Sequence, residues 1–123
     1  MKKKILVVDD EKDICGIMKR ILENEGYAVF EAYDGQEALS KVFEISPDIM
    51  VIDVQMPGKN GFQVCEEIRK DPIYKELPIL MLTVRNSKED RLQGFTSGVD
   101  EYMVKPFDMS EIVARIKVVL ERS

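Results

Sequence analysis

The chain has 123 residues and a mass of 14.1 kDa, the size of one ordinary domain with a single core. Apolar residues make up 45% and charged residues 33%, which excludes a disordered or membrane-embedded chain. The 18 basic and 23 acidic residues give a net charge of −5, which disfavours direct nucleic-acid binding. Histidine is absent, which excludes a histidine-based triad, a histidine metal site and a phosphohistidine carrier.

Two cysteines, Cys15 and Cys65, lie within stretches of helical apolar spacing. We interpret them as buried thiols in a reducing cytoplasm, with a disulfide or redox pair as the alternative. Two cysteines alone supply too few ligands for a metal site. The basic start is followed by an apolar run too short for a signal peptide, and no run approaches the ~20 residues of a membrane span. We therefore expect a cytoplasmic protein without a membrane partner.

Five short, mainly apolar runs predict β-strands buried in a parallel sheet. They are residues 5–8, 28–33, 49–52, 78–83 and 102–104. Between and after these runs, apolar residues recur with the period of an amphipathic helix. The helical sets are Ile14, Ile17, Met18, Ile21 and Leu22; Ala38, Leu39, Val42 and Phe43; Phe62, Val64, Cys65 and Ile68; Leu92 and Phe95; and Ile112, Val113, Ile116, Val119 and Leu120. We expect the second set, Phe43 included, to form the inner face of its helix.

Strand and helix alternate five times, so we predict an α/β fold: a five-stranded parallel sheet with five helices on its two faces. No linker, repeat or low-complexity segment interrupts the chain, so residues 1–123 are expected to form a single domain. In such sheets, ligands bind beyond the carboxyl ends of the strands. The residues at those ends are Asp9, Asp10, Asp53, Thr83 and Lys105.

Each of these end residues has an ordinary explanation when taken alone. Asp9 and Asp10 could cap the first helix, and Thr83 could be a plain strand residue. Together, three carboxylates, a hydroxyl and an ammonium at one rim indicate a site. Crowded carboxylates raise one another's pKa, and Mg²⁺ relieves that repulsion with few protein ligands. An aspartate beside Mg²⁺ can attack a phosphoryl group, with Lys105 and Thr83 as stabilising donors.

Several short segments follow the order and spacing of a known family. They are residues 6–11, 47–48 leading to Asp53, 56–58 with Gly61, Thr83, and residues 102–107. Over essentially its whole length, the chain resembles the CheY-like receiver domain of two-component response regulators. The resemblance implies a flavodoxin-like three-layer sandwich. It also implies a signalling switch that catalyses only its own phosphorylation and slow dephosphorylation, and is no enzyme in the wider sense.

The resemblance assigns roles to the acidic residues. Asp53 would be the phosphoacceptor. Asp10 and Asp53 would ligate Mg²⁺ directly, Asp9 mainly through water, and Gln55 through its backbone carbonyl. The phosphoryl donor would be a histidine kinase or phosphotransfer protein, which supplies the histidine that this chain lacks.

The resemblance also implies a conformational switch. Lys105 would bind the phosphoryl oxygens, and its bond to Pro106 would be cis. Thr83 would move toward the phosphoryl group, and Tyr102 would turn inward behind it. One covalent charge would thus bias a two-state equilibrium and transmit a signal to an effector or partner.

Two positions depart from the family's usual pattern. Val84 follows Thr83 where the family usually has Ala or Ser, and its branched side chain would crowd the phosphoryl pocket. Gln55 and Arg85 stand two residues after Asp53 and Thr83, where side chains would govern water access. These positions leave the lifetime of the phosphorylated state open.

The last helix resembles the family branch that carries a winged-helix DNA-binding domain, although this domain itself is not expected to bind nucleic acid. That branch implies a phosphorylation-dependent homodimer through the fourth helix, fifth strand and fifth helix. Arg91 would pair with Glu111, and Glu101 with Arg115, across the dimer. The alternative is a set of solvated helix faces whose ion pairs contribute little.

Three other functions share part of the pattern. A phosphatase with an aspartyl nucleophile typically has a second Asp two residues later, where this chain has Gln55. A flavin-binding electron carrier needs a phosphate-binding loop after the first strand, where the acidic residues 9–11 would repel phosphate. A scaffold that is never phosphorylated would not need Asp53, Thr83 and Lys105 together.

Overall fold

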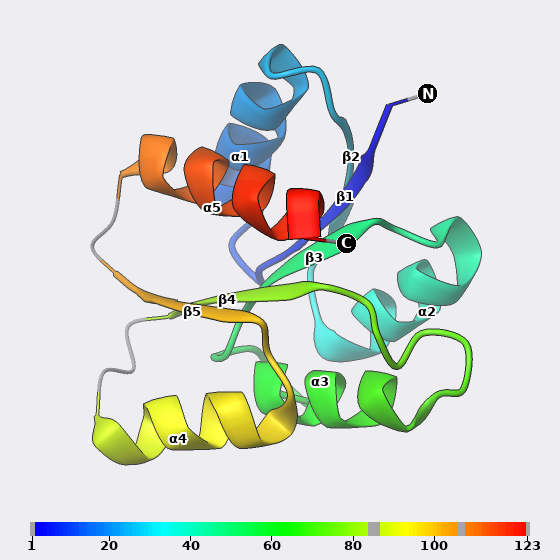
Figure 1. Cartoon of the computed structure of the whole chain (residues 1–123), viewed down its shortest axis with the longest axis vertical. Helices are drawn as coiled ribbons and strands as arrows, with labels where there is room; N and C mark the ends of the chain where they lie inside the picture. The colour runs from blue at the N-terminus through cyan, green and yellow to red at the C-terminus, as the bar shows by residue number, and fades with distance from the viewer. Residues whose placement is uncertain (1, 84–86, 106–107, 123) are drawn as a thin grey trace.

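The structure is a computed structural model that describes residues 2–83, 87–105 and 108–122. Strand and helix alternate along the chain (Figure 1). The strands are β1 (Lys4–Val8), β2 (Ala28–Ala32), β3 (Ile49–Asp53), β4 (Ile79–Thr83) and β5 (Glu101–Val104). The helices are α1 (Lys12–Asn24), α2 (Gly35–Ile45), α3 (Gly61–Lys70), α4 (Lys88–Ser97) and α5 (Met109–Arg122).

The five strands form one parallel sheet in the order β2-β1-β3-β4-β5. Helices α1 and α5 cover one face, and α2, α3 and α4 cover the other (Figure 1). The predicted α/β sandwich is therefore confirmed, and its strand order is the flavodoxin-like one. The direction in which the chain adds strands reverses between β1 and β3, which makes their carboxyl ends the expected ligand site.

The core consists of two apolar layers, one on each face of the sheet. Alternate strand residues enter opposite layers, because successive side chains of a strand point to opposite faces. In β1, Ile5 and Val7 pack toward α1 and α5, whereas Leu6 and Val8 pack toward α2 and α3. All four are essentially fully buried, which explains why the strand sequence is a continuous apolar run.

Local capping fixes where three of the helices begin. The Asp34 side chain accepts a hydrogen bond from the backbone N–H of Glu37 at the start of α2. Asn60 and Gln63 form a reciprocal capping box at the start of α3, and Ser87 with Asp90 forms another at α4. These side chains satisfy backbone donors that the first helical turn leaves free.

One packing prediction is wrong. The Phe43 side chain is 53% exposed and contacts the ring of Tyr74 edge-on, with centroids 5.3 Å apart, instead of facing the core. Helical periodicity alone cannot reveal this contact, because Tyr74 lies in a loop 31 positions away in the sequence.

Strand ends also differ by one residue in places, since Lys4 and Glu101 join the sheet through their backbones.

Both cysteines are buried free thiols, as predicted. The Cys15 thiol lies 3.5 Å from the carbonyl oxygen of Asp9. Burial raises the pKa of both the Cys15 and the Cys65 thiols to about 12. None of the described helices is both long enough and apolar enough to cross a membrane.

Candidate functional site

Two aspartates follow the adjacent strands at the point where the strand order reverses. Asp53 is the last residue of β3, and Asp9 comes directly after β1. The register pairs Val8 with Ile52, so the two carboxylates follow paired residues. Asp9 is only 3% exposed, and the side chain of Asp53 is 12% exposed. Two acidic groups are thus held at the mouth of the core, as predicted.

Lys105 follows β5 at the same carboxyl edge of the sheet and reaches back to these carboxylates. Its Nζ donates to Asp53 Oδ2 at 3.1 Å and lies 3.9 Å from Asp9 Oδ2. The backbone N–H of Lys105 donates to the carbonyl of Thr83 at 2.7 Å, which holds the residue just beyond β5. The lysine side chain is about three-quarters buried, so these attractions are less screened by water than those of surface pairs.

Asp9 occupies an unfavourable electrostatic position. Burial away from water raises the pKa of its carboxyl to about 6, and the neighbouring Asp53 charge adds to the rise. A hydrogen bond from the Glu11 backbone N–H to Oδ1 at 2.9 Å and the Lys105 charge act in the opposite direction. The site therefore favours an added positive charge.

The loop after β3 holds Asp53 in place. Asp53 Oδ1 accepts a hydrogen bond from the Gln55 backbone N–H at 3.1 Å. The Gly61 N–H donates to the Val54 carbonyl at 3.0 Å, which docks the start of α3 against the loop. A Cβ atom at Gly61 would lie 2.6 Å from the Asp53 carbonyl oxygen. The family motif includes Gly61, and this close backbone approach supplies a physical reason for a glycine at that position.

Thr83 and Tyr102 lie on neighbouring strands behind the charged residues. Thr83 is fully buried and pairs with Val104 in the register, while Tyr102 pairs with Met81. Residues 81 and 83 are two apart, so Thr83 and Tyr102 point to the same face of the sheet. The Tyr102 ring is half-buried, 6.4 Å from the Phe95 ring, with the Arg91 guanidinium 5.8 Å from its centroid.

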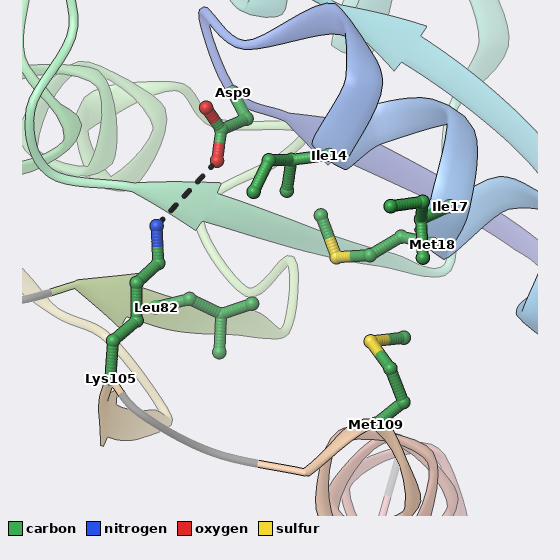
Figure 2. Close-up of a pocket in the computed structure, with 7 residues that line it drawn as sticks. All are labelled: Asp9, Ile14, Ile17, Met18, Leu82, Lys105 and Met109. Carbon is green, nitrogen blue, oxygen red and sulfur yellow. Dashed lines mark ion pairs between the residues drawn. The ribbon is translucent and has the colours of Figure 1, made fainter.

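An apolar cavity of about 270 Å³ opens beside the Lys105–Asp9 ion pair (Figure 2). Its lining comes from the start of α1, the end of β4 and the start of α5. The lining residues are Asp9, Ile14, Ile17, Met18, Leu82, Lys105 and Met109. Ile17 is 54% exposed at this position, so an apolar surface borders the charged site.

Residues 5–117 match the family model of the response regulator receiver domain. The chain belongs to this family. Similar solved structures include a response regulator from Chloroflexus aurantiacus, with 36% identity over 98% of this chain and 99% of that one and a TM-score of 0.92. The Vibrio cholerae chemotaxis protein CheY4 has 35% identity over 97% and 99%, with a TM-score of 0.91. The BeF3-activated DrrB receiver domain has 32% identity over 98% and 99%, with a TM-score of 0.88.

Receiver domains are signalling switches that depend on phosphorylation and interact with histidine kinases or phosphotransfer proteins. The family generally binds Mg²⁺ at an acidic pocket. Within the described ranges, no three Asp, Glu, Cys or His side chains are grouped closely enough to form a metal cluster by themselves. Mg²⁺ usually needs only one or two carboxylates and keeps several waters. Asp9 and Asp53 already share one cation, and Asp10, the next residue after Asp9, has an exposed side chain, so the donor set fits Mg²⁺.

Three of the four residues predicted for a dimer face of the receiver domain have partners within the chain. Arg115 pairs with Glu101 at 2.7 Å, and Arg91 lies over the Tyr102 ring. Glu111 is exposed in the first turn of α5. The cross-dimer pairs remain a prediction, and they would require the Arg115–Glu101 pair to exchange partners.

Three predictions fall on residues outside the described ranges. They concern the crowding by Val84, the water access governed by Arg85, and the cis bond before Pro106. The corresponding part of the phosphoryl pocket therefore stays a sequence-based expectation.

Proposed function

We propose that this receiver domain is a switch activated by transfer of a phosphoryl group to Asp53 from a histidine kinase or phosphotransfer protein. The observation that carries the proposal is the position of Lys105, whose ammonium contacts Asp53 at 3.1 Å and lies 3.9 Å from Asp9. An acceptor carboxylate and a cation are thus held together where the strand order reverses.

The chemistry is a single in-line displacement. A carboxylate oxygen of Asp53 attacks the phosphorus of the partner's phosphohistidine. The new P–O bond forms as the P–N bond breaks, and the imidazole nitrogen takes the bonding electron pair. Lys105 and the hydroxyl of Thr83 stabilise the transferring oxygens, and water later hydrolyses the acyl phosphate slowly without another catalyst.

Asp9, Asp10, Asp53 and the Gln55 backbone carbonyl are the groups that would hold Mg²⁺. When bound, the ion would supply positive charge to the phosphoryl oxygens. Without it, the Asp9 and Asp53 carboxylates repel an incoming phosphoryl group, and Lys105 supplies the positive charge that pairs with both of them.

The cavity beside Lys105 suggests how the donor approaches. Its apolar rim includes Ile17 and Met109, on α1 and α5. A partner helix that packs on this rim would present its histidine next to Asp53. Methionine side chains adapt to different partner shapes, which suits a surface of this kind.

The test is phosphorylation of the whole chain by acetyl phosphate with Mg²⁺, followed by intact-mass spectrometry. The wild type should gain one labile phosphoryl group, and Asp53→Asn should gain none. Asp13→Asn is the matched control, because it removes an exposed carboxylate in the first turn of α1. A labile phosphoryl group on Asp53→Asn would overturn the assignment of the acceptor.

We further propose that the phosphorylated domain, residues 1–123, forms a homodimer through α4, β5 and α5, with Arg91, Glu101, Glu111 and Arg115 in the contact. Light scattering with beryllofluoride and Mg²⁺ should report a dimer that Arg115→Ala weakens. A particle that stays monomeric with the mimic bound would contradict this.

A further inference from the structure

Gly94 lies in the middle of α4, where glycine is an unfavourable choice because it is a poor helix former. A Cβ atom built at this position would lie 2.6 Å from Cδ2 and 2.8 Å from Cε2 of the Tyr102 ring. The next nearest atom, Cε1 of Phe62, is 3.6 Å away, which is an ordinary contact. The Tyr102 ring therefore rests directly against the helix backbone, in space that a single methyl group would fill.

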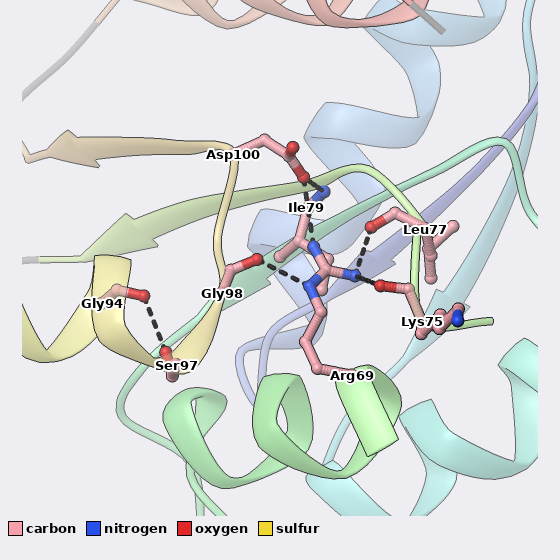
Figure 3. Close-up of polar contacts among 8 residues, drawn as sticks. All are labelled: Arg69, Lys75, Leu77, Ile79, Gly94, Ser97, Gly98 and Asp100. Atoms are coloured by element: carbon pink, nitrogen blue, oxygen red, sulfur yellow. Dashed lines mark hydrogen bonds and ion pairs between the residues drawn. The ribbon is translucent and has the colours of Figure 1, made fainter. Parts of the chain in front are cut away.

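The backbone at Gly94 is held on one side by hydrogen bonds. Its carbonyl accepts a bond from the buried Ser97 hydroxyl at 2.8 Å, shown in Figure 3. The N–H of Gly98 also donates to the Gly94 carbonyl. Gly98 ends the helix with φ +101°, a conformation that side chains rarely adopt.

Arg69 of α3 fixes the end of the same helix. Its Nε donates to the Gly98 carbonyl at 2.8 Å, and Nη1 donates to the carbonyls of Lys75 and Leu77 at 3.0 and 2.7 Å (Figure 3). Nη2 pairs with Asp100 at 3.2 Å. The guanidinium thus ties the end of α4 to the loop before β4 and to the start of β5, so α4 cannot easily move away from the sheet.

Two further neighbours of the Tyr102 ring lie on the exposed side of α4. Phe95 is 54% exposed, and Arg91 is also exposed on the outer side of α4. The ring is the far end of a side chain with two rotatable bonds, whereas Gly94 is held by backbone contacts. If the two must separate, the Tyr102 ring moves and the helix stays.

We propose that Gly94 is a positioning residue for the switch: its missing side chain lets the Tyr102 ring rest against α4, and a methyl group there would drive the ring out. The steric part concerns the fold alone. Its regulatory consequence rests on the proposed function, in which the position of Tyr102 is coupled to phosphorylation of Asp53. Because phosphorylation would turn Tyr102 inward, a variant that drives the ring out should disfavour the phosphorylated arrangement.

A double-mutant cycle tests the steric part. Gly16→Ala is the matched control, because Gly16 is an exposed glycine in α1 with nothing within 4 Å of its Cβ position. Its better helix propensity should raise the folding equilibrium constant roughly fivefold. Gly94→Ala should lower that constant in the wild type but raise it, as at position 16, in a Tyr102→Ala background. A gain of equal size in both backgrounds would overturn the proposal.

Ring position can be read directly with ¹³C-labelled tyrosine. The chain has four tyrosines and no tryptophan, so the aromatic NMR spectrum is simple. Gly94→Ala should shift the ring signals of Tyr102 and leave those of Tyr27, Tyr33 and Tyr74 in place. Unchanged Tyr102 signals in a folded variant would show that the helix, and not the ring, has given way.

The regulatory part is tested by titrating beryllofluoride in the presence of Mg²⁺. Gly94→Ala should bind the mimic at least threefold more weakly than the wild type, and the loss should vanish in the Tyr102→Ala background. An equal or tighter affinity with a displaced ring would overturn the regulatory part. Failure of the wild type to bind the mimic would instead count against the proposed function. The double-mutant cycle and the tyrosine spectra would still test the steric part.

Discussion

The centre of the sheet and its β4–β5 edge, where α4 packs, are held by different kinds of contact. Strands β1 and β3 are buried on both faces, and α3 inserts Phe62 and Ile68 into the core. The described residues of α4 that are buried are the small Gly94 and Ser97, and its large apolar residues Leu92 and Phe95 face solvent.

The difference separates two tasks within one domain. The charged site needs fixed distances between Asp9, Asp53 and Lys105, and dense apolar packing beneath it provides them. At the β4–β5 edge, Arg69 fixes the end of α4, whereas the exposed side chains of Leu92 and Phe95 can rearrange at low cost. A side-chain rearrangement at this edge therefore requires no disruption of the core beneath the charged site.

The largest expected difference in stability is between alanine substitutions of a large apolar residue in α3 and one in α4. Phe62→Ala removes a ring that is 1% exposed and should reduce the free energy of unfolding by about 3–5 kcal/mol. Leu92→Ala removes a side chain that is 66% exposed and should change it by less than about 0.5 kcal/mol. Urea denaturation measures both values. Similar losses for the two variants would mean that α4 is packed as firmly as α3.

A methyl group beside Asp53, the proposed phosphoacceptor, tests how rigid the centre of the sheet is. At Gly61, a Cβ atom would meet backbone atoms, 2.6 Å from the Asp53 carbonyl oxygen and 3.0 Å from the Val54 Cα. Gly61→Ala should therefore destabilise the fold by about 1–3 kcal/mol and slow phosphorylation of Asp53. Calorimetry and acetyl phosphate labelling measure the two effects. Gly16→Ala, which has free space, should show neither loss.

Removal of the Arg69 guanidinium should destabilise the β4–β5 edge and leave the centre of the sheet unchanged. Arg69→Met keeps an apolar stem but removes the guanidinium that contacts Gly98 and Asp100. We expect a loss of about 1–3 kcal/mol, since two partly buried carbonyls lose their charged donor. Hydrogen exchange should speed up at the end of α4 and the start of β5, with β1 nearly unchanged. A uniform increase over all strands would indicate global destabilisation instead.

The alkylation rates of buried thiols can be used to compare local opening in the two regions. Cys15 and Cys65 have pKa values raised to about 12, so at pH 8 their thiolate fractions are about a thousandfold below those of ordinary thiols, and rise with pH. Alkylation should then require opening of the structure. Ser97→Cys places a thiol at a site that is 3% exposed in α4. Peptide mass spectrometry should find this thiol alkylated at least about tenfold faster than Cys65, which corresponds to about 1.4 kcal/mol less opening energy.

Much of the fold follows from the sequence because both faces of the sheet are covered. Five buried strands produce five apolar runs, and the alternation with helices leaves few topologies. The rim residues Asp9, Asp53 and Lys105 were predictable for the same reason, since parallel strands end at one edge. Strand ends were less certain, because Lys4 and Glu101 pair through the backbone and keep polar side chains.

Other features depend on contacts between distant segments. In the sequence, Arg69 is one more basic residue near the end of a helix, and its three carbonyl partners come from two loops. Gly94 is a weak helix former whose reason, the ring of Tyr102, lies on another element. Helical periodicity carries no information about either contact, so these residues could be recognised only in three dimensions.

Strand connectivity makes Lys105 the last member of the charged site to leave the ribosome. The neighbours β2, β1 and β3 emerge first and bring Asp9 and Asp53 together, and Lys105 follows Asp53 by 52 residues. A half-synthesised domain would hold two partly desolvated carboxylates side by side without their lysine, which disfavours early closure. Docking of β5 brings in the lysine and lowers that penalty, so the charged site also makes assembly of the domain more nearly all-or-none.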